Sequence, residues 1–307
     1  MSIQNYLLSF FLKSQTNHSL KLSPEHRFKR SRKLLSKDFS KKSSHSTTQK
    51  STVSDVQVEW IIPNGITHNS QVPVCLYLHG GAFIMGGMNS HRGLGSFLAE
   101  KAQIRVLMVD YRLAPEFPYP AAIDDVMSVY SQLLAEGYSP NRIYFGGDSA
   151  GGNLIVATLL RLQSNNTPLP KAFFLFSPWL DLHNNGQTIY SNTNSDVMLK
   201  EQFLNEAVAL YAPNHSLSSP DISPIFGEFK NFPPSLIIAS ESEILFSDSK
   251  TLHQKLINFG CASELKTWAK TPHAFPVLVR ILPEAKEALV KTAIFLRSFN
   301  TTSNSIT

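Results

Sequence analysis

The stretch Arg142-Ile143-Tyr144-Phe145-Gly146-Gly147-Asp148-Ser149-Ala150-Gly151 decides the fold that this sequence predicts. Its first four residues predict a buried strand, and a helix-forming run over residues 151–162 follows it. Between them lies the pattern G-x-S-x-G, which places a serine in a tight turn between a strand and a helix. A side chain at Gly147 or Gly151 would crowd the neighbouring elements. The context therefore predicts that Ser149 is a nucleophile.

Strands and helices alternate on both sides of this stretch. Apolar runs predict further strands at residues 56–62, 74–78, 106–109, 172–176, 235–239 and 264–268. Helical spacing lies between them, at residues 95–102, 121–134, 248–259 and 284–299. Such alternation is typical of a mostly parallel sheet that is covered by helices on both faces. The predicted fold class is α/β, and 307 residues suffice for one large domain.

The charge of the chain is concentrated near its N-terminus. The net charge is +5, yet residues 1–50 alone hold eleven basic and two acidic residues. We interpret residues 1–50 as a basic segment that either contributes to a helical cap or is partly disordered. Residues 51–300 form the predicted catalytic domain, with a cap insertion at about 180–213, and residues 301–307 form a flexible tail. No nucleic-acid partner is expected, because no aromatic residues are interleaved with the basic ones after Phe39.

The apolar run at residues 6–12 predicts a short helix that packs on the domain. It has neither a charged leader nor a small-residue cleavage site, so we do not interpret it as a signal peptide. No apolar run approaches the length of a transmembrane helix, and a cytoplasmic location is expected. Cys75 and Cys261 are expected to be unpaired core thiols. We expect no metal, because no Cys/His spacing typical of metal ligands occurs. The chain could form a homodimer.

The loop His79-Gly80-Gly81-Ala82-Phe83 follows the strand predicted at residues 74–78. An HGGG-type loop at this place donates backbone N–H groups to the oxyanion of a tetrahedral intermediate. The candidate oxyanion-hole residues are Gly80, Gly81, Ala82 and Ala150, the last because it follows the nucleophile. Ala82 replaces a third glycine, but its donor would be a backbone group and can still serve. His79 is expected to orient the loop rather than to act as a base.

A base and an acid should follow the nucleophile in the order serine, acid, histidine. His273 lies in a loop after the strand predicted at residues 264–268 and is the candidate base. The acid should follow the strand predicted at residues 235–239, where Glu241, Glu243 and Asp248 occur. We favour Glu243, which lies in the loop itself. Asp248 stays the alternative, although its place at the start of a helix also suits a capping role.

Several motifs together resemble those of the hormone-sensitive-lipase-like esterases, a group of the α/β-hydrolase fold. The resemblance covers about residues 58–299 and rests on blocks in the same order: Tyr77-Leu78-His79-Gly80-Gly81, Asp110-Tyr111-Arg112-Leu113-Ala114-Pro115-Glu116, Gly147-Asp148-Ser149-Ala150-Gly151-Gly152-Asn153, Ser177-Pro178-Trp179 and His273-Ala274-Phe275. It implies a catalytic triad, an oxyanion hole built from Gly81, Ala82 and Ala150, an N-terminal cap and no cofactor. It also implies activity on esters of short to medium acyl chains.

The sequence departs from this family at the acid. The usual acid is an aspartate in an Asp-Pro-Leu run, whereas the matching stretch here is Ser242-Glu243-Ile244-Leu245. Glutamate is an accepted triad acid. The expected function is therefore a serine carboxylic ester hydrolase that acts on a small-molecule ester through an acyl-enzyme. The alternatives are an amidase or peptidase with the same triad, and a catalytically silent ligand-binding module on the same fold.

Overall fold

The computed structural model describes residues 1–36 and 44–300 of the chain. Within these residues one sheet has eight strands in the order β1-β2-β4-β3-β5-β6-β7-β8. β2 is antiparallel to both of its neighbours, and every other pair of adjacent strands is parallel. The strands are β1 Ser46–Val53, β2 Val56–Pro63, β3 Val74–Leu78, β4 Arg105–Val109, β5 Ile143–Asp148, β6 Ala172–Phe176, β7 Ser235–Ser240 and β8 Ser263–Trp268.

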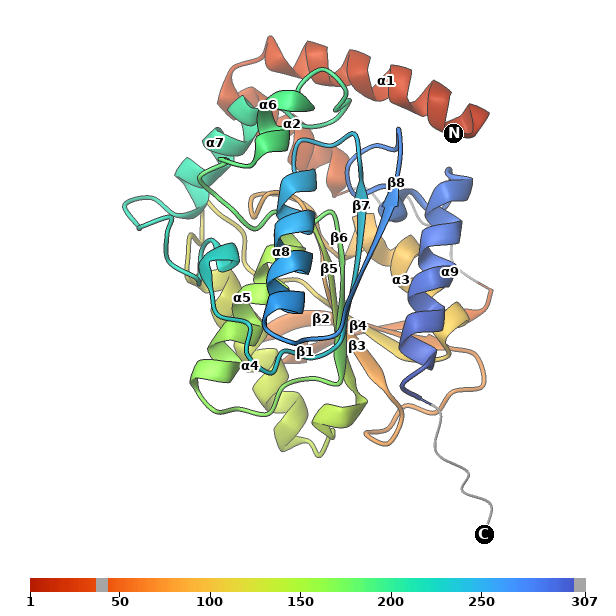
Figure 1. Ribbon diagram of the computed structural model, residues 1–307. Coiled ribbons are helices and arrows are strands. Elements are labelled where there is room, and N and C mark those ends of the chain that lie inside the picture. The colour runs from red at the N-terminus through yellow and green to blue at the C-terminus, as the bar shows by residue number, and fades with distance from the viewer. Residues whose placement is uncertain (37–43, 301–307) are drawn as a thin grey trace.

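Helices cover both faces of the sheet (Figure 1). On one face α4 (Ala121–Ala135), α5 (Ala150–Ser164) and α8 (Phe246–Asn258) pack into one apolar cluster. On the other face α3 (Met88–Ala102) and α9 (Pro283–Arg297) pack into a second one. All residues of β3, β4 and β6 are buried, as expected for central parallel strands that are covered on both faces. The predictions of an α/β fold and a mostly parallel sheet are confirmed.

β1 is a strand that the sequence analysis did not predict. Its sequence, Ser-Thr-Thr-Gln-Lys-Ser-Thr-Val, is polar, and most of its side chains are exposed at the edge of the sheet. Hydrophobic alternation is therefore absent, and the pairing with β2 along its whole length holds the strand in place. The boundary expected at residue 50 is corrected, because it falls inside β1. The expected tail 301–307 lies outside the described residues, as do residues 37–43 of the basic segment.

Four helices gather over the carboxyl ends of the parallel strands (Figure 1): α1 Ile3–Leu20, α2 Pro24–Leu35, α6 Gln187–Ser191 and α7 Glu201–Tyr211. Buried Arg27 of α2 forms an ion pair with Glu206 of α7. Arg32 of α2 donates to Ile84 O in the loop after β3 and pairs with Glu116. The N-terminal segment and the inserted segment are thus joined to each other and to the body.

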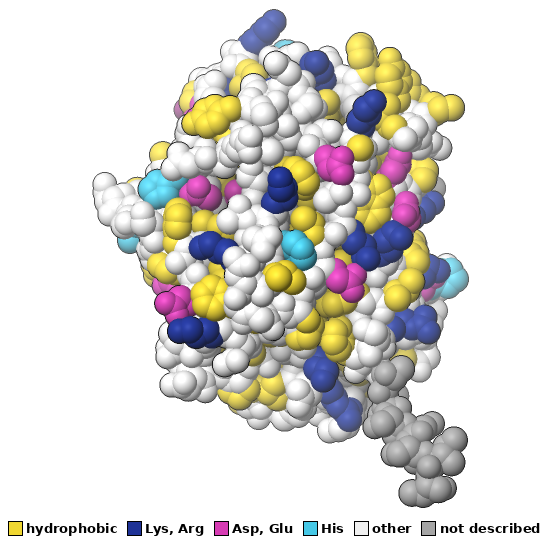
Figure 2. Space-filling model, in the orientation of Figure 1, with side chains coloured by type: hydrophobic (Ala, Val, Ile, Leu, Met, Phe, Trp, Pro, Cys, Tyr) yellow, Lys and Arg dark blue, Asp and Glu magenta, His cyan; other side chains and the backbone are white. Residues whose placement is uncertain are grey.

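α1 packs on the domain as the sequence predicts, but it is longer than the short helix expected. The helix has 18 residues, and the side chains of Tyr6, Leu7, Phe10 and Phe11 point into solvent. Figure 2 shows hydrophobic side chains gathered at this end of the molecule, over the first half of α1. On the inner side Asn5 is fully buried, and Leu8 packs against the apolar cluster of α3 and α9. None of the helices in the described ranges combines the length and apolarity needed to cross a bilayer.

Candidate active site

Ser149 occupies the turn between β5 and α5. Its backbone has φ +53° and ψ −120°, a conformation that few residues other than glycine adopt and that stores strain. A Cβ on Gly151 would lie 2.1 Å from Leu78 O, and a Cβ on Gly147 would lie 2.7 Å from Gly151 C. The turn therefore requires both glycines, for the steric reason that the sequence indicated. This strained turn places Ser149 at the carboxyl edge of the sheet, at the start of a helix that favours negative charge.

The loops after β7 and β8 bring Glu243 and His273 to this edge. His273 Nε2 lies 2.9 Å from Ser149 Oγ, and His273 Nδ1 lies 2.7 Å from Glu243 Oε2. Because a carboxylate oxygen only accepts, Nδ1 carries the ring proton and Nε2 can accept the proton of Ser149. Both Glu243 and His273 are buried, whereas Ser149 is partly open to solvent. The three residues that the sequence singled out therefore form one continuous chain of hydrogen bonds.

The charge around His273 favours its protonated form. Burial alone would lower the pKa of this imidazole. The hydrogen bond and negative charge of Glu243 outweigh burial and raise the pKa above its ordinary value of 6.5, with a further contribution from Asp196. The imidazolium that forms when His273 takes a proton is thus stabilised by the surrounding protein.

Asp248, the alternative acid, lies in a different network. Its Oδ2 accepts hydrogen bonds from Leu180 N at 2.6 Å and from Asp181 N at 3.0 Å. Burial raises the pKa of Asp248 to about 7. These contacts hold the backbone at the start of the inserted segment, after β6. The carboxylate that contacts His273 is that of Glu243. The geometry therefore favours Glu243 as the acid and gives Asp248 a structural role.

Two residues of the inserted segment hold the loop of Glu243, and the sequence analysis missed both. Asp196 is buried, and its Oδ2 accepts from Ile244 N at 2.9 Å. Asn192 Nδ2 donates to Glu243 O at 2.9 Å. Neither residue lies in a motif, and about fifty positions separate each from Glu243. Only the three-dimensional arrangement reveals them.

The loop after β3 lies beside Ser149 because Leu78 pairs with Gly147 in the sheet. Gly80 N is already used, since it donates to Asp148 Oδ1 at 3.0 Å. The expectation that Gly80 is an oxyanion donor is therefore corrected: its N–H fixes the loop. Gly81 and Ala82 follow with φ of +129° and +55°. Ala150 N belongs to the first turn of α5, where N–H groups have no partner within the helix.

Asp148, the residue before Ser149 in the G-x-S-x-G motif, holds the loop of Gly80 in place. The sequence analysis did not predict this role. Asp148 is buried and also accepts from Tyr77 Oη at 2.8 Å, while His91 Nε2 lies 3.2 Å away. Burial alone would raise the pKa of Asp148, but His91 and Tyr77 hold it below the usual value. A charged Asp148 thus locks the loop beside Ser149.

His79 is buried behind the same loop. Its ring stacks on Tyr111 with 4.3 Å between the centroids, and its Nδ1 lies 2.8 Å from Gly80 O. Burial lowers the pKa of His79 to about 4, so the ring is neutral at physiological pH and donates from Nδ1. These contacts fit the expected role of orienting the loop.

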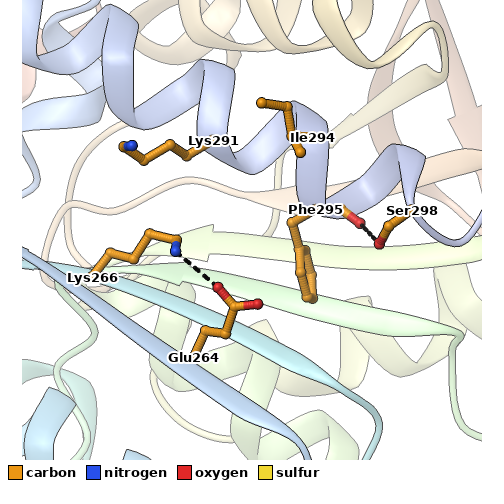
Figure 3. Close-up of a pocket in the computed structure, with 6 residues that line it drawn as sticks. All are labelled: Glu264, Lys266, Lys291, Ile294, Phe295 and Ser298. Carbon is orange, nitrogen blue, oxygen red and sulfur yellow. Dashed lines mark hydrogen bonds and ion pairs between the residues drawn. The ribbon is translucent and has the colours of Figure 1, made fainter.

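A separate groove of about 340 Å³ lies between β8 and α9 (Figure 3). Its lining residues are Glu264, Lys266, Lys291, Ile294, Phe295 and Ser298. They belong to the start of β8 and the end of α9, whereas His273 follows the end of β8. The groove is therefore distinct from the site of Ser149. Within the residues that the structure describes, no group of three or more His, Cys, Asp or Glu side chains could hold a metal ion.

Comparison with known proteins identifies the family. Residues 75–277, about two thirds of the chain, match the family described as α/β hydrolase fold. The chain belongs to the α/β-hydrolase family. Within the α/β-hydrolases, an esterase of Acinetobacter venetianus is 35% identical over 232 residues, which cover 75% of this chain and 77% of that protein. An acetyl-hydrolase of Streptomyces hygroscopicus is 34% identical over 247 residues, which cover 80% of this chain and 81% of that protein.

A solved α/β-hydrolase structure extends the likeness to the whole fold. It is that of an esterase from the bacterial hormone-sensitive lipase family, with a TM-score of 0.89 and 32% identity. The match covers 98% of this chain and 99% of that one, so it includes the N-terminal helices. The prediction of a hormone-sensitive-lipase-like α/β-hydrolase is confirmed.

Proposed function

We propose that this protein is a serine carboxylic ester hydrolase that acts on esters of short to medium acyl chains through an acyl-enzyme intermediate. The observation that carries the proposal is the chain of hydrogen bonds from Ser149 Oγ through His273 to Glu243 Oε2. A serine hydroxyl is a weak nucleophile, and a hydrogen-bonded imidazole with an oriented tautomer is what activates it.

The proposed reaction has two steps. His273 Nε2 takes the proton of Ser149 while Ser149 Oγ attacks the ester carbonyl and forms a tetrahedral intermediate. The backbone N–H groups of Gly81, Ala82 and Ala150 donate to the oxyanion. His273 then gives its proton to the leaving alcohol as the C–O bond breaks. In the second step water attacks the acyl-enzyme with His273 again as base, which releases the acid and restores Ser149.

We further propose that α1, α2 and the inserted segment at about 180–213 form the cap over the acyl pocket. Support comes from the contacts that join them to the oxyanion loop. Phe83 of that loop stacks on Tyr211 of α7 with 3.8 Å between the ring centroids, and Trp179 packs against Phe83. The cap and the oxyanion loop are therefore packed together through aromatic side chains that are fully buried.

The acyl preference is tested by p-nitrophenyl esters of increasing acyl length. We expect kcat/KM to be highest for acetate to hexanoate esters and to fall for longer chains, because an acyl pocket of fixed size rejects extra methylene groups. The name of the Streptomyces relative, an acetyl-hydrolase, supports short acyl groups. Matched p-nitroanilides serve as the control. Faster hydrolysis of the anilides than of the esters would contradict the proposal and favour an amidase.

The pH dependence follows from the environment of His273. The imidazole must be neutral to accept the proton of Ser149, and Glu243 raises its pKa above 6.5. We therefore expect kcat/KM to fall as the pH decreases through this raised pKa. In Glu243→Gln the raising interaction is lost, so the midpoint of the acid limb should move to lower pH. Profiles of kcat/KM from about pH 5 to pH 9 measure both midpoints. A midpoint that moves upward in the variant contradicts this account.

A homodimer and a cytoplasmic location stay predictions from the sequence. The proposed substrate is a small-molecule ester that enters between the cap and the carboxyl edge of the sheet.

A further inference from the structure

The outer face of α1 is apolar over its first half. The side chains of Ile3 and Phe10 are 78% and 76% exposed, and those of Tyr6, Leu7 and Phe11 are also more than half exposed. These five residues recur at helical spacing and lie on one side of the helix. Large apolar side chains that gather on a surface mark an interaction site far more often than single ones do. We call this set the α1 apolar face.

The inner face of α1 fixes the helix in this orientation. Asn5 Nδ2 donates to Lys270 O at 3.0 Å, and Thr16 Oγ1 donates to Val197 O at 2.9 Å. Ser2 caps the helix and also donates to Glu284 through its backbone N–H and its hydroxyl. Because specific polar contacts hold both ends of the helix, rotation that would bury the α1 apolar face would break them. The exposure is therefore built into the docking of α1.

Basic residues outnumber acids in the segment that carries the α1 apolar face. The outer side of α1 continues with Lys13, and Lys21 follows the helix. Residues 1–36 contain seven Lys and Arg against one acid, Glu25. Arg27 and Arg32 form ion pairs, while the other five, Lys13, Lys21, Lys29, Arg30 and Lys33, are exposed and form no ion pair within the described residues. An apolar strip on a segment with excess positive charge complements an anionic lipid surface.

We propose that α1 docks this protein on the surface of an anionic phospholipid bilayer. The α1 apolar face lies among the lipid headgroups and the upper acyl chains, and Lys13 and Lys21 lie against the lipid phosphates. The net positive charge of residues 1–36 favours lipid over a second copy of the same face, because two such segments would repel each other. Lys270, which α1 contacts, is three residues from His273, so docking would bring the cap end of the molecule to the lipid.

Binding to vesicles tests the proposal without any ester chemistry. Ether-linked phosphatidylglycerol and phosphatidylcholine vesicles carry no carboxylic ester, so co-sedimentation measures docking even if the proposed hydrolase function fails. We expect binding to mixed vesicles that weakens with salt. Phe10→Ser together with Phe11→Ser should weaken it on the order of ten-fold or more. Lys13→Ser with Lys21→Ser should weaken it about five-fold per side chain, and only on vesicles with phosphatidylglycerol.

A matched control removes apolar surface elsewhere. Ile257→Ser with Ile294→Ser changes two exposed side chains on α8 and α9 and should leave vesicle binding unchanged. Circular dichroism verifies that each variant is folded. The proposal is overturned if the wild-type protein binds no vesicles, or if the Phe10 and Phe11 variant binds as tightly as wild type. A wild-type dimer that this variant dissociates, without vesicle binding, would instead assign the face to a second copy of the chain.

Discussion

Ser149→Ala is expected to lower kcat for a short-chain p-nitrophenyl ester by about 10⁶-fold. The alanine removes the only atom that can form the acyl-enzyme, and His273 then has no hydroxyl to deprotonate. What remains is the activity that the oxyanion donors and substrate binding supply on their own. A fluorophosphonate probe should label the wild-type protein at Ser149 and leave the variant unlabelled, which also separates an active hydrolase from a silent binding module.

The control for this variant is Ser164→Ala, which removes an exposed serine from the other end of α5. It should keep both activity and labelling. If Ser149→Ala kept more than a small fraction of wild-type turnover in protein free of wild-type enzyme, Ser149 would not be the nucleophile.

Glu243→Gln is expected to lower kcat by about 10⁴-fold. The amide is nearly the same size as the carboxyl group, so the loop should keep its shape. It lacks the charge that stabilises the imidazolium, and its NH₂ group can turn toward His273 Nδ1 and impose the wrong tautomer. Steady-state kinetics of the purified variant, next to wild type on the same ester, measure the loss.

Asp248→Asn is the matched control, because it makes the same chemical change at the other buried acid. Its Oδ atom can still accept from Leu180 N and Asp181 N, so the start of the inserted segment should hold. We expect kcat within a few-fold of wild type. The opposite ranking, with Asp248→Asn the more damaging change, would make Asp248 the acid.

The residues proposed for catalysis were predictable because each one follows a strand in a recognisable local pattern. Ser149 has its glycines, and Glu243 and His273 lie in loops after apolar strands. Chain order and strand position therefore sufficed to choose Ser149 and His273. Both Glu243 and Asp248 follow β7, so the choice between them needed the distance from each carboxylate to its partner. Glu243 contacts His273 Nδ1, whereas Asp248 contacts Leu180 N.

Other features depend on contacts between distant segments and carry no local signal. The loss of Gly80 as a donor follows from Asp148, whose carboxylate reaches back across the sheet. β1 is polar and depends on its pairing with β2. The apolar run in α1 predicts a helix that packs on the domain, but it does not show that the contacts of Asn5 and Thr16 leave Tyr6, Leu7, Phe10 and Phe11 exposed. In each case a polar contact decides, and hydrophobic pattern alone gives no account of it.

The hydrogen bond from Ile244 N to Asp196 has a consequence for enzyme engineering. The inserted segment is the part that an engineer would exchange between relatives to alter acyl selectivity. Here the same segment also supplies Asp196, the acceptor that holds the loop of Glu243. An exchanged segment without an aspartate at this position would leave the buried N–H of Ile244 without an acceptor. Selectivity and turnover are therefore coupled traits in this scaffold, and chimeras should be designed with the loop and the insert as one exchangeable unit.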